Sequence, residues 1–221
     1  MLSSFREKYI GDRAFYRTLL AVAAPIIVQQ GITSFVNLLD NVMVGGLGTE
    51  SISAVAIVNQ ILMVFNLALF GGLSGASIYG AQFFGKGDWE GMKHTFRFRL
   101  VIGIILCAAA AAICLKSGSF FISKFLSESS EPGDLALTMS LARNYLSLML
   151  WGIVPFMLVQ CVTGVLRESG ETLVPMAASV TAILVNLVLN YGLIFGRLGL
   201  PRLEVRGAAV ATVVSRFVEL C

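Results

Sequence analysis

The stretch that decides the fold covers residues 19–44, LLAVAAPIIVQQGITSFVNLLDNVMV. Its only charged residue is Asp40, and every residue from 18 to 39 is uncharged. A helix needs about 20 predominantly apolar residues to cross the hydrocarbon layer of a bilayer. This stretch therefore predicts a membrane-spanning helix that carries a single carboxylate.

Similar apolar runs follow along the rest of the chain. They predict spans at 52–82, 97–118, 141–166 and 172–196, and a sixth helix at 207–221 that is expected to be truncated. Of all residues, 57% are hydrophobic and only 13% are charged, whereas soluble domains have roughly 25% charged residues. We therefore predict an all-α integral membrane protein, a six-helix transmembrane bundle with an incomplete sixth helix.

The third predicted span is the shortest uncharged run and has basic residues near its ends. Arg97, Arg99 and Lys116 occupy these positions, and long basic side chains at helix ends can reach toward the membrane interface. We expect them to lengthen the span in this way. The short polar turn RESGE at 167–171 predicts that the fourth and fifth spans are antiparallel neighbours.

Basic residues also predict the orientation. Lys and Arg are more frequent in the loops on the same side as the N-terminus than in those on the other side, and cytoplasmic loops retain such residues. We predict a multi-pass protein of the cytoplasmic membrane, surrounded by the lipid bilayer, with its N-terminus in the cytoplasm. No aromatic-interleaved basic patch is present, so no nucleic acid partner is expected.

The sequence lacks the motifs of a membrane enzyme. It contains no HExxH or GxSxG motif, and its single histidine, His94, lies outside the predicted spans. A catalytic site would need such a constellation of residues. We therefore expect a protein that is not an enzyme and uses no cofactor.

Polar residues follow one face of the first predicted span. Gln29, Thr33 and Asn37 precede Asp40 by 11, 7 and 3 positions, which places the four side chains on one face of a helix with 3.6 residues per turn. A carboxylate inside a membrane is costly and usually has a function. Pro25 removes a backbone hydrogen bond from this helix and predicts a kink. The alternative is that Asp40 lies at the level of the headgroups, because glycines follow it closely.

A second polar face is predicted on the fifth span. Ser179, Asn186 and Asn190 are spaced by seven and four positions. Buried amides need hydrogen-bond partners, and these amides could simply bond to each other or to neighbouring backbone. If the first and fifth spans meet, Asp40 and the two asparagines offer oxygen ligands and one negative charge, which suit a proton or Na⁺ site. For Gln160, a lone amide on the fourth span, helix-to-helix bonding explains its presence as well as ligand contact does.

Five stretches in this order resemble the multidrug and toxic compound extrusion (MATE) family of transporters. They are PIIVQQGITSFVNLLDNVMVGGLG at 25–48, GASIYGAQFFGKGD at 75–88, LRESGETLVP at 166–175, NLVLNYGLIFG at 186–196 and GAAVAT at 207–212. The resemblance covers essentially the whole chain. It implies the N-terminal lobe of a protein with two six-helix lobes, whose C-terminal lobe is absent from this sequence.

The resemblance also implies a function. The family members are antiporters coupled to H⁺ or Na⁺ that export chemically diverse drugs, often cationic or aromatic, across the cytoplasmic membrane. We expect alternating access, in which drug and cation compete for one region of this lobe. The polar residues Gln29, Thr33, Asn37, Gln160 and Ser179 are expected to line the substrate cavity.

Individual positions match the family's ion-coupling residues. Asp40 matches the first-helix acid on which coupling depends, and Pro25 matches the proline at which that helix bends. Asn186 and Asn190 match the fifth-helix pair, and Thr212 falls where a sixth-helix hydroxyl joins the cation site. Some members have Asp at the position of Asn190, so this site has one negative charge fewer, which weakens the case for a Na⁺ ion bound by Asp40, Asn186 and Asn190.

A lipid-linked oligosaccharide or lipid flippase of the same broad superfamily is the alternative function. Such a protein would be expected to line its cavity with several Arg or Lys residues that hold phosphate groups. The interiors of the five complete predicted spans contain none, and this absence favours the drug antiporter.

Overall fold

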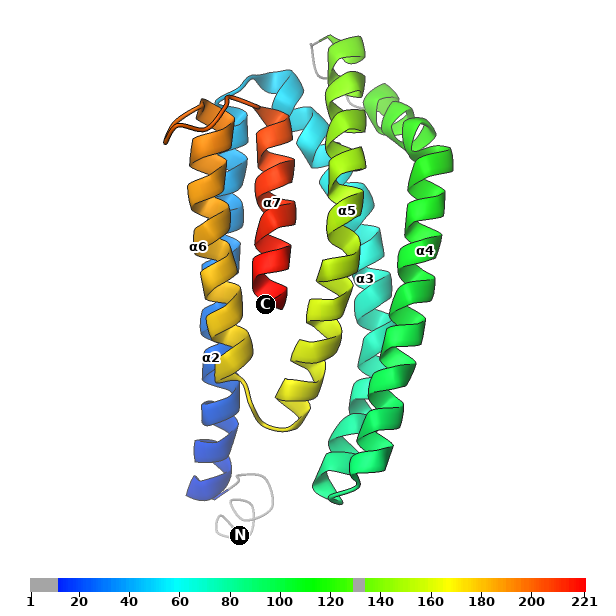
Figure 1. Ribbon diagram of the computed structural model, residues 1–221, viewed down its shortest axis with the longest axis vertical. Coiled ribbons are helices and arrows are strands. Elements are labelled where there is room, and N and C mark those ends of the chain that lie inside the picture. The colour runs from blue at the N-terminus through cyan, green and yellow to red at the C-terminus, as the bar shows by residue number, and fades with distance from the viewer. Residues whose placement is uncertain (1–11, 129–133) are drawn as a thin grey trace, which may run out of the picture.

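The computed structural model describes residues 12–128 and 134–221, and the described chain forms six helices (Figure 1). They are α2 (Arg13–Gly45), α3 (Thr49–Gly85), α4 (Trp89–Glu128), α5 (Leu135–Glu168), α6 (Leu173–Phe195) and α7 (Val205–Leu220). Five of them, α2 to α6, are long and apolar enough to cross a membrane. The all-α, six-helix membrane fold predicted from the apolar runs is confirmed.

The helix ends follow from local chemistry. Asp12 precedes α2 and its side chain accepts a hydrogen bond from the Phe15 N–H, and Asp134 caps α5 in the same way. Carboxylates at this position satisfy backbone N–H groups that have no partner within the helix. At the C-terminal end of α6, Gly196 has φ 68°. Glycine adopts this left-handed conformation without a Cβ clash. This glycine ends α6 and starts the turn that leads to α7.

The helices form two groups that meet at α7. In Figure 1, α2 and α6 lie side by side, α3, α4 and α5 pack together, and α7 stands between α6 and α5. The fourth and fifth predicted spans, α5 and α6, run in opposite directions as predicted, but the prediction that they are neighbours is wrong. They contact each other little beyond their turn, since α6 packs mainly on α7 and α5 packs on α7, α3 and α4.

Small residues explain why α7 fits between these helices. Ala208, Ala209 and Ala211 are buried on α7. A Cβ on Gly207 would lie 2.7 Å from the backbone of Leu193 on α6, and this lack of a side chain lets the start of α7 approach α6 closely. Small residues at helix contacts permit such close approach in membrane proteins.

Arg99 does not extend toward the membrane interface as the sequence suggested. Its side chain is 1% exposed, pairs with Glu168 of α5, and donates a hydrogen bond of 3.1 Å to Ser77 Oγ of α3. Glycines make room for this pair, since a Cβ on Gly164 would lie 2.8 Å from Arg99 Nη1 and one on Gly80 would clash with the Glu168 carboxylate. Arg99 and Glu168 therefore tie α3, α4 and α5 together in the interior.

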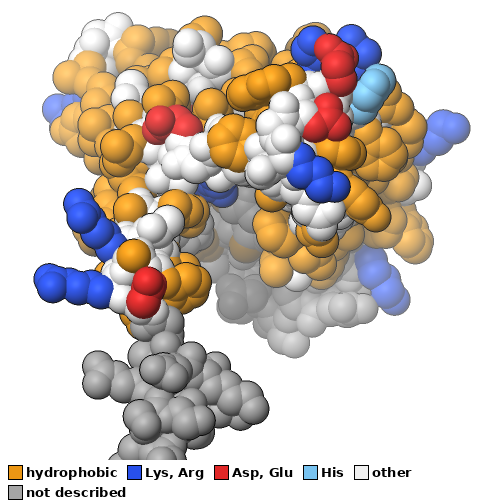
Figure 2. All heavy atoms as spheres, turned by 90° about the horizontal axis from the view of Figure 1, so that it is seen from below, with side chains coloured by type: hydrophobic (Ala, Val, Ile, Leu, Met, Phe, Trp, Pro, Cys, Tyr) orange, Lys and Arg blue, Asp and Glu red, His pale blue; other side chains and the backbone are white. Residues whose placement is uncertain are grey.

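The outer surface is suited to lipid. Large hydrophobic side chains are exposed along α2, α3, α4, α5 and α6. Seen from the end that carries the α3–α4 and α5–α6 turns, hydrophobic side chains surround the flanks, and several charged side chains gather at the rim (Figure 2). This distribution is the one expected of a helix bundle whose sides face a bilayer.

Candidate ion and substrate site

A polar cavity of about 700 Å³ lies between the two helix groups, lined by side chains of α2, α3, α5, α6 and α7. It contains all nine residues that the sequence assigned to ion coupling or to substrate contact. These are Gln29, Thr33, Asn37, Asp40, Gln160, Ser179, Asn186, Asn190 and Thr212. The two polar faces predicted on separate helices therefore face the same space.

One end of the cavity is built around Asp40. Asn190 Nδ2 on α6 donates to Asp40 Oδ1 on α2 at 2.7 Å and also lies 3.1 Å from Asn186 Oδ1. Asn186 Nδ2 lies 3.4 Å from Thr212 Oγ1 on α7. Asn186 and Asn190 are both buried, so a chain of amides inside the bundle connects the carboxylate to a hydroxyl on a third helix.

The amides of this chain can serve either charge state of the acid. Rotating the Asn186 amide by half a turn brings its Nδ2 to 3.1 Å from Asp40 Oδ2. Asn190 Oδ1 is buried and accepts no hydrogen bond from any described residue, although buried carbonyl oxygens normally have a partner. Asn190 therefore donates to the carboxylate as observed, and its oxygen can accept from a protonated acid only after the amide rotates. Asn186 presents its oxygen to Asp40 as observed, which suits the protonated acid, and presents its N–H after rotation, which suits the carboxylate.

Na⁺ takes oxygen ligands, as other hard cations do. The side chains around Asp40 can be compared with this requirement. Asp40, Asn186 and Asn190 carry side-chain oxygens at this end of the cavity, and Asn190 Oδ1 has an unused lone pair. In the observed arrangement, however, Asn190 presents its N–H to the carboxylate. The donor set fits a cation once this amide rotates. Among the described residues, no group of three or more His, Cys, Asp or Glu side chains could hold a metal ion.

The opposite end of the cavity contains a hydrogen-bonded network that joins four helices. Gln29 Nε2 on α2 donates to Ser179 Oγ on α6 at 2.6 Å, and Ser179 Oγ donates to Glu219 Oε1 on α7 at 2.6 Å. Arg216 Nη1 lies 3.2 Å from Glu219 Oε2, and Arg167 Nη2 at the end of α5 donates to Gln29 Oε1 at 3.1 Å. Gln29 and Ser179 thus belong to a charged network that the sequence analysis did not foresee.

Sequence reasoning missed Arg167, Arg216 and Glu219. The sequence places Arg167 in a polar turn, and it places Arg216 and Glu219 in the predicted incomplete sixth helix. The spacing on that helix does indicate a common face, because Thr212, Arg216 and Glu219 are separated by four and three positions. No comparable signal exists for Arg167.

The proline on α2 leaves the helix intact. Hydrogen-bonded helix continues from Arg13 to Gly45 across Pro25, so the kink inferred from this residue remains a prediction. Asn37 and Gln160 line the cavity, and their contact with substrate also remains a prediction.

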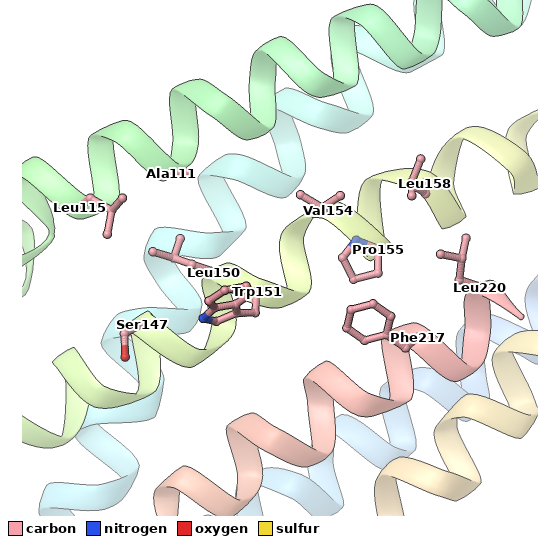
Figure 3. Close-up of a pocket in the computed structure, with 10 residues that line it drawn as sticks. All are labelled: Ala111, Leu115, Ser147, Leu150, Trp151, Val154, Pro155, Leu158, Phe217 and Leu220. Carbon is pink, nitrogen blue, oxygen red and sulfur yellow. The ribbon is translucent and has the colours of Figure 1, made fainter.

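A second pocket, of about 530 Å³, lies between α4, α5 and α7 and is almost entirely apolar (Figure 3). Phe217 of α7 points toward Pro155 of α5, and Trp151 and Leu150 lie further along α5. Ser147 is the one polar residue in its lining. This pocket offers nothing to a charged ligand, so the polar cavity is the candidate site.

Comparison with known proteins identifies the class. The family profile described as MatE matches residues 25–192, about three quarters of the chain, and the chain belongs to this family. Its members are transporters of the multi-pass membrane type, which confirms the predicted resemblance, the membrane class and the prediction that the chain is not an enzyme.

Individual relatives agree with this assignment. The chain is 27% identical over 91% of its length to the probable multidrug resistance protein NorM of Thermotoga maritima, covering 42% of that protein. It is 30% identical over 92% of its length to the FAD transporter of Shewanella oneidensis, covering 44% of it. The crystal structure of MATE in the straight conformation matches with a TM-score of 0.75 at 25% identity, over 91% of this chain and 42% of that one. The chain thus spans less than half the length of these relatives.

Proposed function

We propose that this chain is the N-terminal lobe of an antiporter, coupled to H⁺ or Na⁺, that exports drugs or other xenobiotics across the cytoplasmic membrane with its N-terminus in the cytoplasm. The observation that carries this proposal is the bond between Asp40 and Asn190, a carboxylate held by an amide inside a cavity between transmembrane helices. The name of the Thermotoga relative, a probable multidrug resistance protein, supports the substrate class.

The proposed mechanism uses competition between cation and drug. Asp40 takes up a proton or Na⁺, its amide partners reorient, and the cavity then binds drug less tightly. Thermodynamic linkage requires that drug weaken cation binding by the same factor. Exposure of the cavity alternates between the two sides of the membrane, as in transporters with a central site between two repeats. The test is drug uptake into inverted vesicles that contain the complete gene product, under an imposed pH or Na⁺ gradient.

The amide partner is expected to matter less than the acid. In the complete gene product, Asn190→Ala should slow gradient-driven efflux severalfold without abolishing it, because the amide supplies geometry and no titratable charge. Dye uptake into inverted vesicles measures the rate. Asn144→Ala, an amide deletion outside the cavity lining, serves as the control. An unchanged rate for Asn190→Ala would remove this residue from the site.

The chain by itself should not transport. The relatives are more than twice as long, and alternating access in this design needs a second lobe against which the first moves. Vesicles that contain only residues 1–221 are therefore expected to show no drug efflux above the protein-free background. Efflux at a rate comparable to that of a two-lobe relative would contradict the proposal that transport needs a second lobe.

A flippase for lipid-linked oligosaccharides or lipids remains the second candidate. The sequence argument against it was that the spans contain no basic residue in their interiors, yet Arg167 and Arg216 line the cavity. Basic side chains suit phosphate groups, and one relative is named as a transporter of FAD, a molecule that carries phosphates. Titrating the purified complete gene product with cationic dyes and with lipid-linked sugars separates the two functions.

A further inference from the structure

The cavity contains positive as well as negative side chains. Among the described residues, four charged side chains line it, namely Asp40, Glu219, Arg167 and Arg216. The two positive and two negative charges cancel formally. A cavity built to hold simple cations would be expected to carry an excess of negative charge, because opposite charges stabilise a ligand in a low-dielectric site.

Glu219 is already satisfied. One of its oxygens accepts from Ser179 and the other pairs with Arg216, whose guanidinium also lies over the Phe156 ring at 4.6 Å. Arg216 and Glu219 therefore neutralise each other within α7, and the hydrogen bond from Ser179 links Glu219 to α6. Two charges are left without an ion-pair partner in the described part of the chain, Asp40 at one end and Arg167 at the other.

Arg167 has donors to spare. Its Nη2 bonds to the neutral oxygen of Gln29, and its Nε is buried and donates to no described residue. Glu219 is near enough to attract Arg167 through space, but both of its oxygens have other partners. Arg167 is only partly buried, and a guanidinium without an ion-pair partner in such a site attracts an anion.

The two unpaired charges lie far apart. Arg167 bonds to Gln29, which precedes Asp40 by eleven positions on α2, a separation of about 16 Å along a helix axis with a rise of 1.5 Å per residue. We propose that Arg167 forms an anion subsite at the end of the cavity opposite Asp40, which binds the carboxylate or phosphate group of an amphoteric ligand whose cationic group faces Asp40. This inference rests on the proposed transport function and specifies the substrate class.

A matched pair of dyes tests the subsite. The first is a rhodamine with a free benzoate, and the second is the methyl ester of the same rhodamine, so the two differ only in the anionic group. Binding to the purified complete gene product is followed by fluorescence polarisation. A charge-assisted hydrogen bond from Arg167 should make the free acid bind about tenfold more tightly than the ester.

Variants assign the preference to this residue. Arg167→Gln keeps a hydrogen-bonding side chain and is expected to remove the preference for the acid, and saturable binding of the ester shows that the variant is folded. Arg167→Lys keeps the charge and should retain part of the preference. Arg97→Gln is the same substitution at an exposed position outside the cavity and should behave as the parent. Equal affinity of the parent for acid and ester, or a preserved preference in Arg167→Gln, would overturn the proposal.

Two further measurements complete the test. Competition with phosphatidylglycerol and with phosphatidylcholine in mixed micelles identifies the source of the anion. Displacement of the acid dye by phosphatidylglycerol alone assigns the subsite to a lipid phosphate, and lack of displacement assigns it to a soluble ligand. Gradient-driven uptake of the ester tests transport separately. Transport without acid preference would refute only the subsite, whereas acid preference without transport would refute only the proposed function.

Discussion

Replacing Asp40 with asparagine in the complete gene product is expected to reduce efflux driven by a pH or Na⁺ gradient to the background of empty vesicles. Asparagine has nearly the same shape as aspartate, and its amide can still bond to Asn190, so the local packing should persist. It cannot take up a proton and carries no charge for a cation. Drug binding should therefore survive while the link between the gradient and the drug is lost.

The measurement is dye uptake into inverted vesicles under an imposed gradient, which corresponds to efflux from the cell, with expression and membrane insertion checked by immunoblotting. Asp12→Asn is a matched control on the same helix. Asp12 caps α2 outside the cavity, and asparagine is an equally good cap, so this variant should pump at the parental rate. If Asp40→Asn also pumps at the parental rate, Asp40 is a headgroup-level residue and the coupling site lies outside this chain.

Arg99→Leu is expected to have the largest effect on stability, a loss of about 3–5 kcal/mol in the free energy of unfolding. The substitution leaves the Glu168 carboxylate buried without its cation, since the side chain of Glu168 is only 8% exposed. Three helices meet at this pair, so the loss should loosen α3, α4 and α5 together. Thermal unfolding of the purified complete gene product, followed by intrinsic fluorescence, measures the change.

Two variants separate the buried charge from other causes. The double variant Arg99→Leu, Glu168→Leu removes both charges and should recover most of the lost stability, because apolar residues of similar size often replace buried ion pairs without loss. Lys93→Met breaks the exposed pair with Glu90, whose side chains are 59% and 71% exposed, and should have an effect near zero. A single Arg99→Leu variant as stable as the parent would show that the pair contributes nothing.

The sequence by itself determined the helices and the polar cavity residues of α2 and α6. Long uncharged runs exist because every backbone polar group in lipid must be bonded within its own helix, and length and composition therefore report each span directly. Periodicity within one helix placed Gln29, Thr33, Asn37 and Asp40 on a common face, and the cavity confirms that these side chains face one space. Their roles in coupling and substrate contact remain predictions.

Only the tertiary structure decided which helices meet. Whether α7 packs between α5 and α6 depends on how well the small residues on its surface fit against these two helices. The short turn at 167–171 joins α5 to α6 and gives no information about α7. Arg99 could be taken for an interfacial residue because its partner, Glu168, lies 69 positions away. Arg167 likewise reaches Gln29 across 138 positions. Ion pairs and hydrogen bonds between distant segments follow from packing, and periodicity within one helix cannot report them.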